Sequence, residues 1–316
     1  MRSAPVIYVS LITALLGSVL IATAVGSVSI PIPSIVAVFL AEAIGVIPVN
    51  WLPDQTAYEA IVWYLRLPRV ILAALVGGAL ALAGAVLQGL FRNPMADPGI
   101  IGISSGGALG AVIAVMSGLA ANALWSLPVL AFVGAAGATW TIYSLSTQAG
   151  RTPLATLLLS GLAVSAFATA LTSLLLTLAQ DIFAFREVLF WLLGGLDGRG
   201  WSHVGLAAGP ILVGGIVLLL FADELNIVAA TGEAGASSVG VEMQQTKRRV
   251  LMLTALITGA AVSVSGIIGF VGLIVPHLVR FLTGNDQRLL LPASVLAGGS
   301  LLMLAATLAR TLIAPQ

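Results

Sequence analysis

Cysteine is absent from the 316 residues of this chain. Its absence excludes disulfides, zinc–thiolate sites and cysteine nucleophiles, and it says nothing about the redox compartment. Histidine is almost as scarce, because only His203 and His277 occur and they lie far apart in the sequence. We therefore expect no metal site and no resident cofactor in this chain.

Charge is the second scarcity. Only 8% of the residues are charged, against about 25% in a typical soluble domain. The 13 basic and 12 acidic residues are too few to cover a soluble surface, while 59% of the residues are hydrophobic. Lipid is therefore the expected solvent. The net charge of +1 offers no basic field for nucleic acid.

Lysine occurs once, at Lys247, and Arg248 follows it. A phosphate-binding P-loop needs Gly-Lys-Ser/Thr, because its lysine reaches the terminal phosphates of ATP. The chain has no such tripeptide, so we do not expect it to be an ATP-hydrolysing enzyme. If ATP drives it, a separate chain must hydrolyse the nucleotide.

Long apolar runs dominate what is present. A bilayer core about 30 Å thick needs roughly 20 apolar residues in a helix, whereas barrel strands would be about 10 residues of alternating pattern. Eight runs approach the helical length, at about 6–28, 70–90, 100–119, 127–145, 154–178, 204–221, 250–268 and 289–308. A shorter run at 269–282 contains Pro276 and predicts a broken ninth span. The sequence thus predicts an all-α bundle of about nine spans in a single domain, 1–316.

Two runs near the N-terminus are ambiguous. Residues 1–28 resemble a signal peptide after Arg2, but the run is long for a signal h-region, so we prefer a retained first span. Residues 30–53 hold several prolines and Glu42, and we expect an interfacial helix and loop within an outer segment at about 29–68. Lys and Arg count eight against five in favour of a cytoplasmic N-terminus.

The stretch 92–110 is predicted to form a tight inner turn followed by a helix. Its glycines Gly102, Gly106 and Gly110 repeat at four-residue spacing, which favours close approach of a neighbouring helix. Plain packing explains these glycines, although Ser104 and Ser105 add polar groups that suit a transport pathway.

The longest inner loop, at about 223–247, contains a run of small residues that we call the small-residue segment. A short helix of small residues suits docking into a groove of a partner, and the alternative is a solvated linker. The segment comprises Gly232, Glu233, Ala234, Gly235, Ala236, Ser237, Ser238, Val239 and Gly240.

Two further segments are predicted on the outer side. Aromatic residues at 183–201 surround Arg186, with Trp191 and Trp201 as membrane-interface anchors, or the segment forms the outer lip of a pathway. Arg66 and Arg69 either snorkel at a helix end or dock an acidic protein surface.

These segments resemble, in order and spacing, the FecCD family of permeases from iron-siderophore, haem and cobalamin ABC importers. The resemblance covers roughly 65–310, and its most specific parts are Arg-Asn-Pro-x-Ala-Asp-Pro-Gly from Arg92 and the glycine-rich stretch ending in Pro276, His277 and Arg280.

The resemblance implies a ten-span fold that works as a homodimer in the bacterial cytoplasmic membrane. It implies two ATPase subunits that carry ATP and Mg, docked on the small-residue segment, and a soluble binding protein that meets Arg66, Arg69 and Arg310. It also implies ATP-driven alternating access for a haem, ferric siderophore or cobalamin. The expected path and gate residues are Asn93, Pro94, Ser104, Ser105, Gly106, Arg151, Thr152, Pro153, Leu154, Ala155, Arg186, Trp191, Pro276, His277 and Arg280.

Two departures and two rivals accompany this hypothesis. Pro153 and Leu154 stand where some family members carry polar gate residues, and no tenth span follows Arg310 before the chain stops at Gln316. A secondary transporter or channel for a small solute is the main alternative. An intramembrane enzyme would need clustered catalytic groups, for which His277 with Arg280 is the only candidate.

Overall fold

The computed structural model describes residues 4–26, 28–44, 55–99, 101–123 and 125–312. Part of the predicted interfacial segment, 45–54, and the chain end at 313–316 lie outside the described residues. All regular elements of the described chain are helices, apart from one isolated backbone bridge between Gln148 and Arg151. The predicted all-α class is therefore confirmed.

The helices run in this order, with two π-helical segments labelled η: α1 (Ala4–Ala24), α2 (Ile32–Phe39), η1 (Leu40–Ile44), α3 (Gln55–Glu59), η3 (Ala60–Arg66), α4 (Leu67–Phe91), α5 (Ile103–Met116), α6 (Leu119–Asn122), α7 (Ser126–Ser146), α8 (Leu154–Thr177), α9 (Ile182–Leu193), α10 (Trp201–Leu219), α11 (Ala222–Ser238), α12 (Met243–Ser265), α13 (Val271–Thr283) and α14 (Gln287–Leu312).

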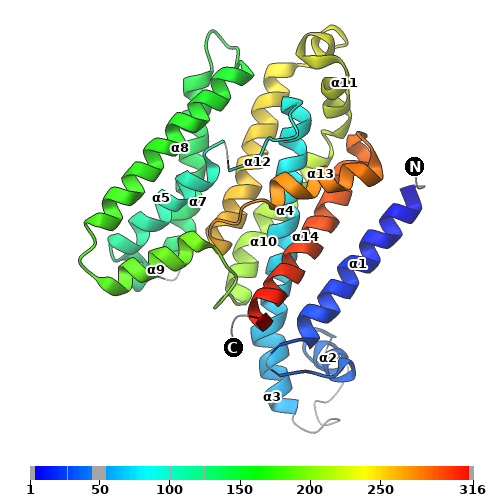
Figure 1. Ribbon diagram of the computed structural model, residues 1–316, viewed down its shortest axis with the longest axis vertical. Coiled ribbons are helices and arrows are strands. Elements are labelled where there is room, and N and C mark those ends of the chain that lie inside the picture. Colours follow the sequence, from blue (N-terminus) through cyan, green and yellow to red (C-terminus); the bar gives the residue numbers. More distant parts are fainter. Residues whose placement is uncertain (1–3, 27, 45–54, 100, 124, 313–316) are drawn as a thin grey trace.

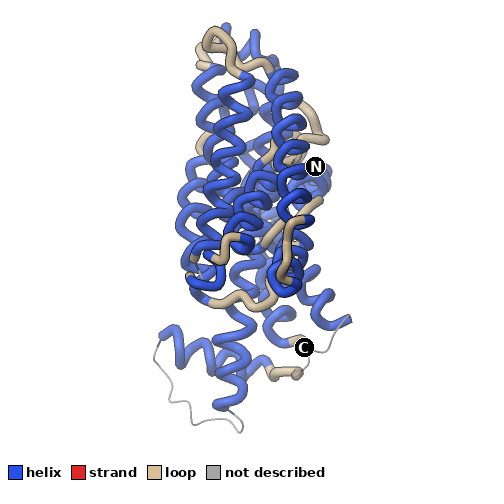
Figure 2. The backbone as a smooth tube through the Cα atoms, turned by 90° about the vertical axis from the view of Figure 1, so that its left-hand side faces the viewer, coloured by secondary structure: helices blue, strands red, loops and turns tan. Residues whose placement is uncertain are grey.

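The long helices lie side by side along one axis, and the short α2 and α3 gather at one end (Figures 1 and 2). We call this the α3 end, and the opposite end, which carries α11, the α11 end. Seven helices of the described chain are long and apolar enough to cross a membrane. The two remaining predicted spans correspond to α5 and α13, which have 14 and 13 residues.

Two boundaries differ from the sequence prediction. The outer segment predicted at 29–68 is helical from Gln55 onward, so the helix before α4 is continuous with it and places Arg66 inside a helix. The break in the ninth span lies before Pro276, because α13 continues through that proline. The turn is made instead by residues 266–270, where Gly266 and Phe270 both have positive φ.

Helix α4 is the axis of the bundle. Of its 25 residues 21 are buried, and it contacts α10, α12, α13 and α14. A second group, α5, α7, α8 and α9, lies to one side in Figure 1 and joins the axis through α12. The bundle is thus built around one helix that has almost no surface left for lipid.

Glycine sets the closest helix contacts. A side chain at Gly84 of α4 would overlap the carbonyl oxygen of Gly272 at the start of α13, and Gly77 meets Gly298 of α14 in the same way. Gly106 and Gly110 of α5 lie against the backbone of α7, as predicted, whereas Gly102 precedes the helix as its N-cap. Within lipid, such small-residue contacts let backbones approach closely enough for dispersion forces to hold helices together.

We expect Gly84→Ala to lower stability by about 1–3 kcal/mol, because the new methyl group forces α13 away from α4. Thermal unfolding in detergent measures the change. Gly137→Ala in α7 is the matched control, since nothing lies within 4 Å of a side chain there. An unchanged melting temperature for Gly84→Ala would show that α13 is not held by this contact.

Candidate functional site

Arg66 is buried at the α3 end, with 4% of its surface exposed. Its Nη1 donates to the carbonyl oxygens of Thr23 at 2.7 Å and Ala24 at 3.1 Å, and its Nη2 donates to that of Val28 at 2.5 Å. The last carbonyls of a helix have no partner within the helix, and a cation is favoured beside them. Arg66 therefore caps the C-terminus of α1.

Arg310 of α14 shares this task. Its Nη2 donates to the carbonyl oxygens of Ala22 at 3.0 Å and Val25 at 2.7 Å. Arg69 instead forms an ion pair of 3.1 Å with the exposed Asp197, which precedes α10. Docking by the three arginines stays a prediction, but the geometry turns Arg66 inward and leaves Arg69 paired at the surface.

An open cavity of about 530 Å³ lies beside these arginines. Arg69, Arg310 and Asp197 line it together with mostly apolar residues of α4, α14 and the α12–α13 connection.

The two residues predicted to mark the outer lip differ in exposure. Arg186 is exposed on α9, but Trp191 is buried at 5% exposure among Ala108, Ala131 and Val262, so it is not a membrane-interface anchor.

The small-residue segment lies at the α11 end and is partly helical, as predicted. Helix α11 is broken at Gly232, whose φ of 74° and ψ of 179° are not helical. This backbone conformation is essentially confined to glycine, because other residues place their Cβ against the backbone. The break separates residues 222–231 from a short second piece, 233–238.

The second piece is exposed on its outer side. Ala234, Ser237 and Ser238 are exposed, and Val239 is 64% exposed. Its inner side is held by a small apolar cluster in which Val228, Ala236 and Met243 are buried. An open groove of about 600 Å³ runs between this piece, Arg151 and the start of α12.

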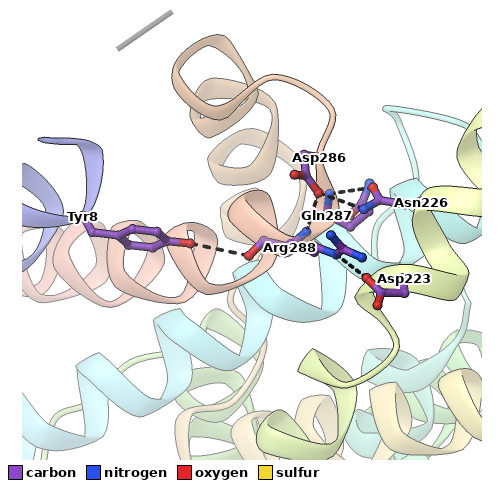
Figure 3. A network of polar contacts seen from close by, with 6 residues as sticks. All are labelled: Tyr8, Asp223, Asn226, Asp286, Gln287 and Arg288. Carbon is purple, nitrogen blue, oxygen red and sulfur yellow. Dashed lines mark hydrogen bonds and ion pairs between the residues drawn. The ribbon is translucent and has the colours of Figure 1, made fainter. Parts of the chain in front are cut away.

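The first piece of α11 is attached to the start of α14 (Figure 3). Asp223 pairs with Arg288, and Asn226 donates to Asp286 at 2.8 Å while accepting from the backbone of Gln287 at 2.8 Å. The hydrogen bond from Arg288 lowers the pKa of Asp223 from its usual value. Sequence reasoning missed this network because its members lie 60 or more residues apart.

The second piece of α11 is attached elsewhere, through Lys247 of α12. Lys247 Nζ donates to Glu233 Oε2 at 2.7 Å and to the carbonyl oxygen of Thr152 at 2.9 Å. The backbone N–H of Thr152 donates to Gln244 Oε1 at 3.0 Å. We call Lys247, Glu233, Thr152 and Gln244 the Lys247 junction. The two pieces of α11 are thus tied to different helices on either side of Gly232.

The predicted gate residues lie around this junction. Thr152 is buried, Leu154 half-buried, and Arg151, Pro153 and Ala155 are exposed. The turn before them is closed by backbone hydrogen bonds between Gln148 and Arg151, with positive φ at Ala149 and Gly150. Such a turn matches a two-residue hairpin, whose central residues both need positive φ.

Gln88 of α4 holds the start of α13, which also lies close to Asp97 in the turn that follows α4. Gln88 Nε2 donates to the carbonyl oxygens of Gly272 at 3.3 Å and Leu273 at 3.2 Å, and its Oε1 accepts from Arg280 at 3.0 Å. Asp97 accepts from the backbone of Gly99 at 2.8 Å, while burial raises the pKa of its carboxyl group. Gln88 was another residue whose role the sequence did not reveal.

An open cavity of about 1040 Å³ unites part of the predicted path. Asn93, Pro94, His277 and Arg280 all line it, beside Arg92 and the start of α14. Ser104, Ser105 and Gly106 lie elsewhere, on α5, where Ser105 Oγ donates to the carbonyl oxygen of Gly102 at 3.1 Å. His277 is exposed and stacks edge-on against Phe281, and Pro276 is buried within α13.

Comparison with known proteins identifies the family to which this architecture belongs. The model of the FecCD transport family matches residues 13–316. The cobalamin import system permease protein BtuC of Halobacterium salinarum is 47% identical over 264 residues, which cover 83% of this chain and 70% of that protein. The hemin transport system permease protein HmuU of Yersinia pestis is 46% identical over 268 residues, covering 83% and 79%. A metal-chelate type ABC transporter solved in an inward-facing conformation is 30% identical, with a TM-score of 0.84 over 97% of this chain and 91% of that one. This chain is a member of the FecCD transport family.

Proposed function

We propose that this chain is the membrane-spanning permease subunit of an ATP-driven importer for a bulky metal chelate. The observation that carries the proposal is the second piece of α11, a short helix of small residues set off by Gly232 and exposed at one end of a membrane bundle. Its relatives are named as permeases for cobalamin and hemin, so the cargo class is a metal-bearing macrocycle or chelate.

In this proposal a separate partner protein hydrolyses ATP. The chain lacks a Gly-Lys-Ser/Thr tripeptide, and its single lysine is occupied by Glu233 and Thr152. Two ATPase subunits would bind ATP and Mg and dock on the small-residue segment, with the groove beside Arg151 as part of the contact. The α11 end then faces the cytoplasm, and the bias of Lys and Arg toward that end supports this orientation.

The direction of force follows from the attachments of α11. A displacement of residues 233–238 would be transmitted to α12 and the start of α8 through the Lys247 junction. Residues 222–231 would remain bound to α14 through Asp223 and Arg288. The change in angle between these helices would open and close a path between two copies of the chain, with the cavity at Asn93 and Arg280 as its inner mouth.

The proposal is tested in vesicles that contain the chain, its ATPase and its binding protein, with haem, ferric siderophore and cobalamin as probes. We expect accumulation of one probe only with ATP. Ala234→Asp with Val239→Asp places two charges on the exposed docking surface, so ATPase co-purification and uptake should fall together. Met95→Asp is the control, because Met95 is a similarly exposed apolar residue that lines neither the groove beside Arg151 nor the cavity at Asn93 and Arg280. Accumulation in vesicles without any ATPase would contradict the proposal.

The break in α11 gives a second prediction. Gly232→Ala should cost about 1–3 kcal/mol or straighten the helix, because alanine cannot hold the observed backbone angles without strain. We expect less ATPase to co-purify with the variant. Gly209→Ala in α10, where nothing lies within 4 Å, should co-purify like wild type. Equal co-purification of both variants would mean that the docking helix needs no fixed angle.

The α3 end gives a third prediction, for docking of a soluble binding protein. Arg69→Glu should abolish stimulation of ATP hydrolysis by the loaded binding protein, because it reverses the charge of a surface cation, while basal hydrolysis persists. Asp197→Asn breaks the same ion pair but keeps the cation, and it should dock normally. If both variants behave alike, the ion pair matters and the cation does not.

A further inference from the structure

Lys247 is the most deeply buried charged residue of the described chain, with 1% of its surface exposed. Burying an ammonium group is costly unless its N–H donors find acceptors. Here one donor meets the carboxylate of Glu233 and another the carbonyl oxygen of Thr152. The proposed function names the Lys247 junction as a contact between segments, but it does not say why a buried cation is needed there.

The two acceptors belong to two different segments. Glu233 opens the second piece of α11, the docking helix, whereas Thr152 lies in the turn between α7 and α8, among the predicted gate residues. Thr152 is held on both sides of its backbone, since its N–H donates to Gln244 and its carbonyl accepts from Lys247. Its side chain also bonds Thr147 Oγ1 at 2.9 Å.

Neither segment can leave α12 without stripping an acceptor from the buried ammonium. Gln244 and Lys247 are three residues apart on one helix face, so both can bind the backbone of Thr152. We call the turn between α7 and α8 that contains Thr152 the gate turn. Only Pro153 separates Thr152 from Leu154, where α8 begins. A displacement of the docking helix is therefore delivered to the first turn of α8.

We infer that Lys247 is a positioning residue that makes the docking helix, the gate turn and the start of α12 move as one body, while Gly232 lets this body turn against the first piece of α11. The inference rests on the proposed function, because it assigns the route by which an ATPase moves the gate. If Lys247 only stabilised the fold, its loss would not change how much chelate is transported per ATP. If Lys247 positions the gate turn, its loss lets ATP be hydrolysed without transport.

Lys247→Met tests the route in the reconstituted full assembly, since methionine keeps the apolar stem and removes the ammonium. We expect the ATPase to remain bound and to hydrolyse ATP, while chelate accumulated per ATP falls roughly tenfold, within the range of measured couplings between sites. Arg248→Met removes an exposed charge from the next position and should leave the ratio unchanged. A normal ratio in Lys247→Met overturns the inference, and so does loss of ATPase binding, which would make Lys247 a folding residue.

The partner residue supplies a second criterion. Glu233→Gln should lower the same ratio, and the double variant with Lys247→Met should be no worse than Lys247→Met alone, because both changes break one link. Additive losses would show that the two residues act separately, and the inference would be wrong.

The wild-type chain offers a test that needs no loss of function, because Lys247 is its single lysine. An amine-reactive ester followed by mass spectrometry reports whether the junction opens. We expect Lys247 to stay protected with and without ATP, whereas the exposed lysine created by Arg248→Lys should be labelled quickly. Labelling of Lys247 at that rate in any nucleotide state overturns the inference. Failure of the wild-type assembly to accumulate any probe would instead count against the proposed function.

Discussion

The close approach of helix backbones around α4 is the constraint on which the rest of the structure depends. Lipid chains are as apolar as the helix surfaces, so burial from water does not hold membrane helices together. Contact at van der Waals distance must do so, and the glycines at 77 and 84 of α4 allow it where Gly298 and Gly272 face them. Because α4 is enclosed in this way, its neighbours α10, α12, α13 and α14 have fixed positions around one axis.

Polar side chains then act as ties between helices that already touch. Arg66 and Arg310 cap the end of α1. Gln88 binds backbone carbonyls at the start of α13, and Lys247 connects three segments. In water each tie would compete with solvent, but near or within lipid an unmade hydrogen bond costs more. Arg66, Arg310 and Lys247 accordingly donate to backbone carbonyl oxygens at helix ends and turns.

The sequence predicted the features that depend on composition and run length. Each of the nine predicted apolar runs corresponds to a helix of the described chain, and most of the small-residue segment lies exposed at one end, while Gly232 and Ala236 are buried. It could not predict roles that depend on tertiary contacts. Arg66 looked like a surface cation, since nothing near it in the sequence shows that Thr23 and Val28 would supply acceptors. Trp191 looked like an interface anchor for the same reason, although α5, α7 and α12 enclose its ring.

The proposed transport path between two copies of the chain agrees with how the interior of one copy is packed. The two cavities lined by predicted docking and path residues lie at opposite ends of the described chain, and α4 passes between them with 21 of its 25 residues buried. A flat, bulky chelate cannot move along a helix that is packed this closely without separating the glycine contacts that define the fold. In contrast, only 17% of the apolar window of α8 is buried, and α9 exposes Phe183, Phe190 and Leu193. An apolar face of this kind can be covered by lipid or by a second copy, and only the second arrangement places α8, which the Lys247 junction reaches, beside a passage. The packing of one chain thus agrees with the proposed path between two chains, in which the driving movement starts at the α11 end.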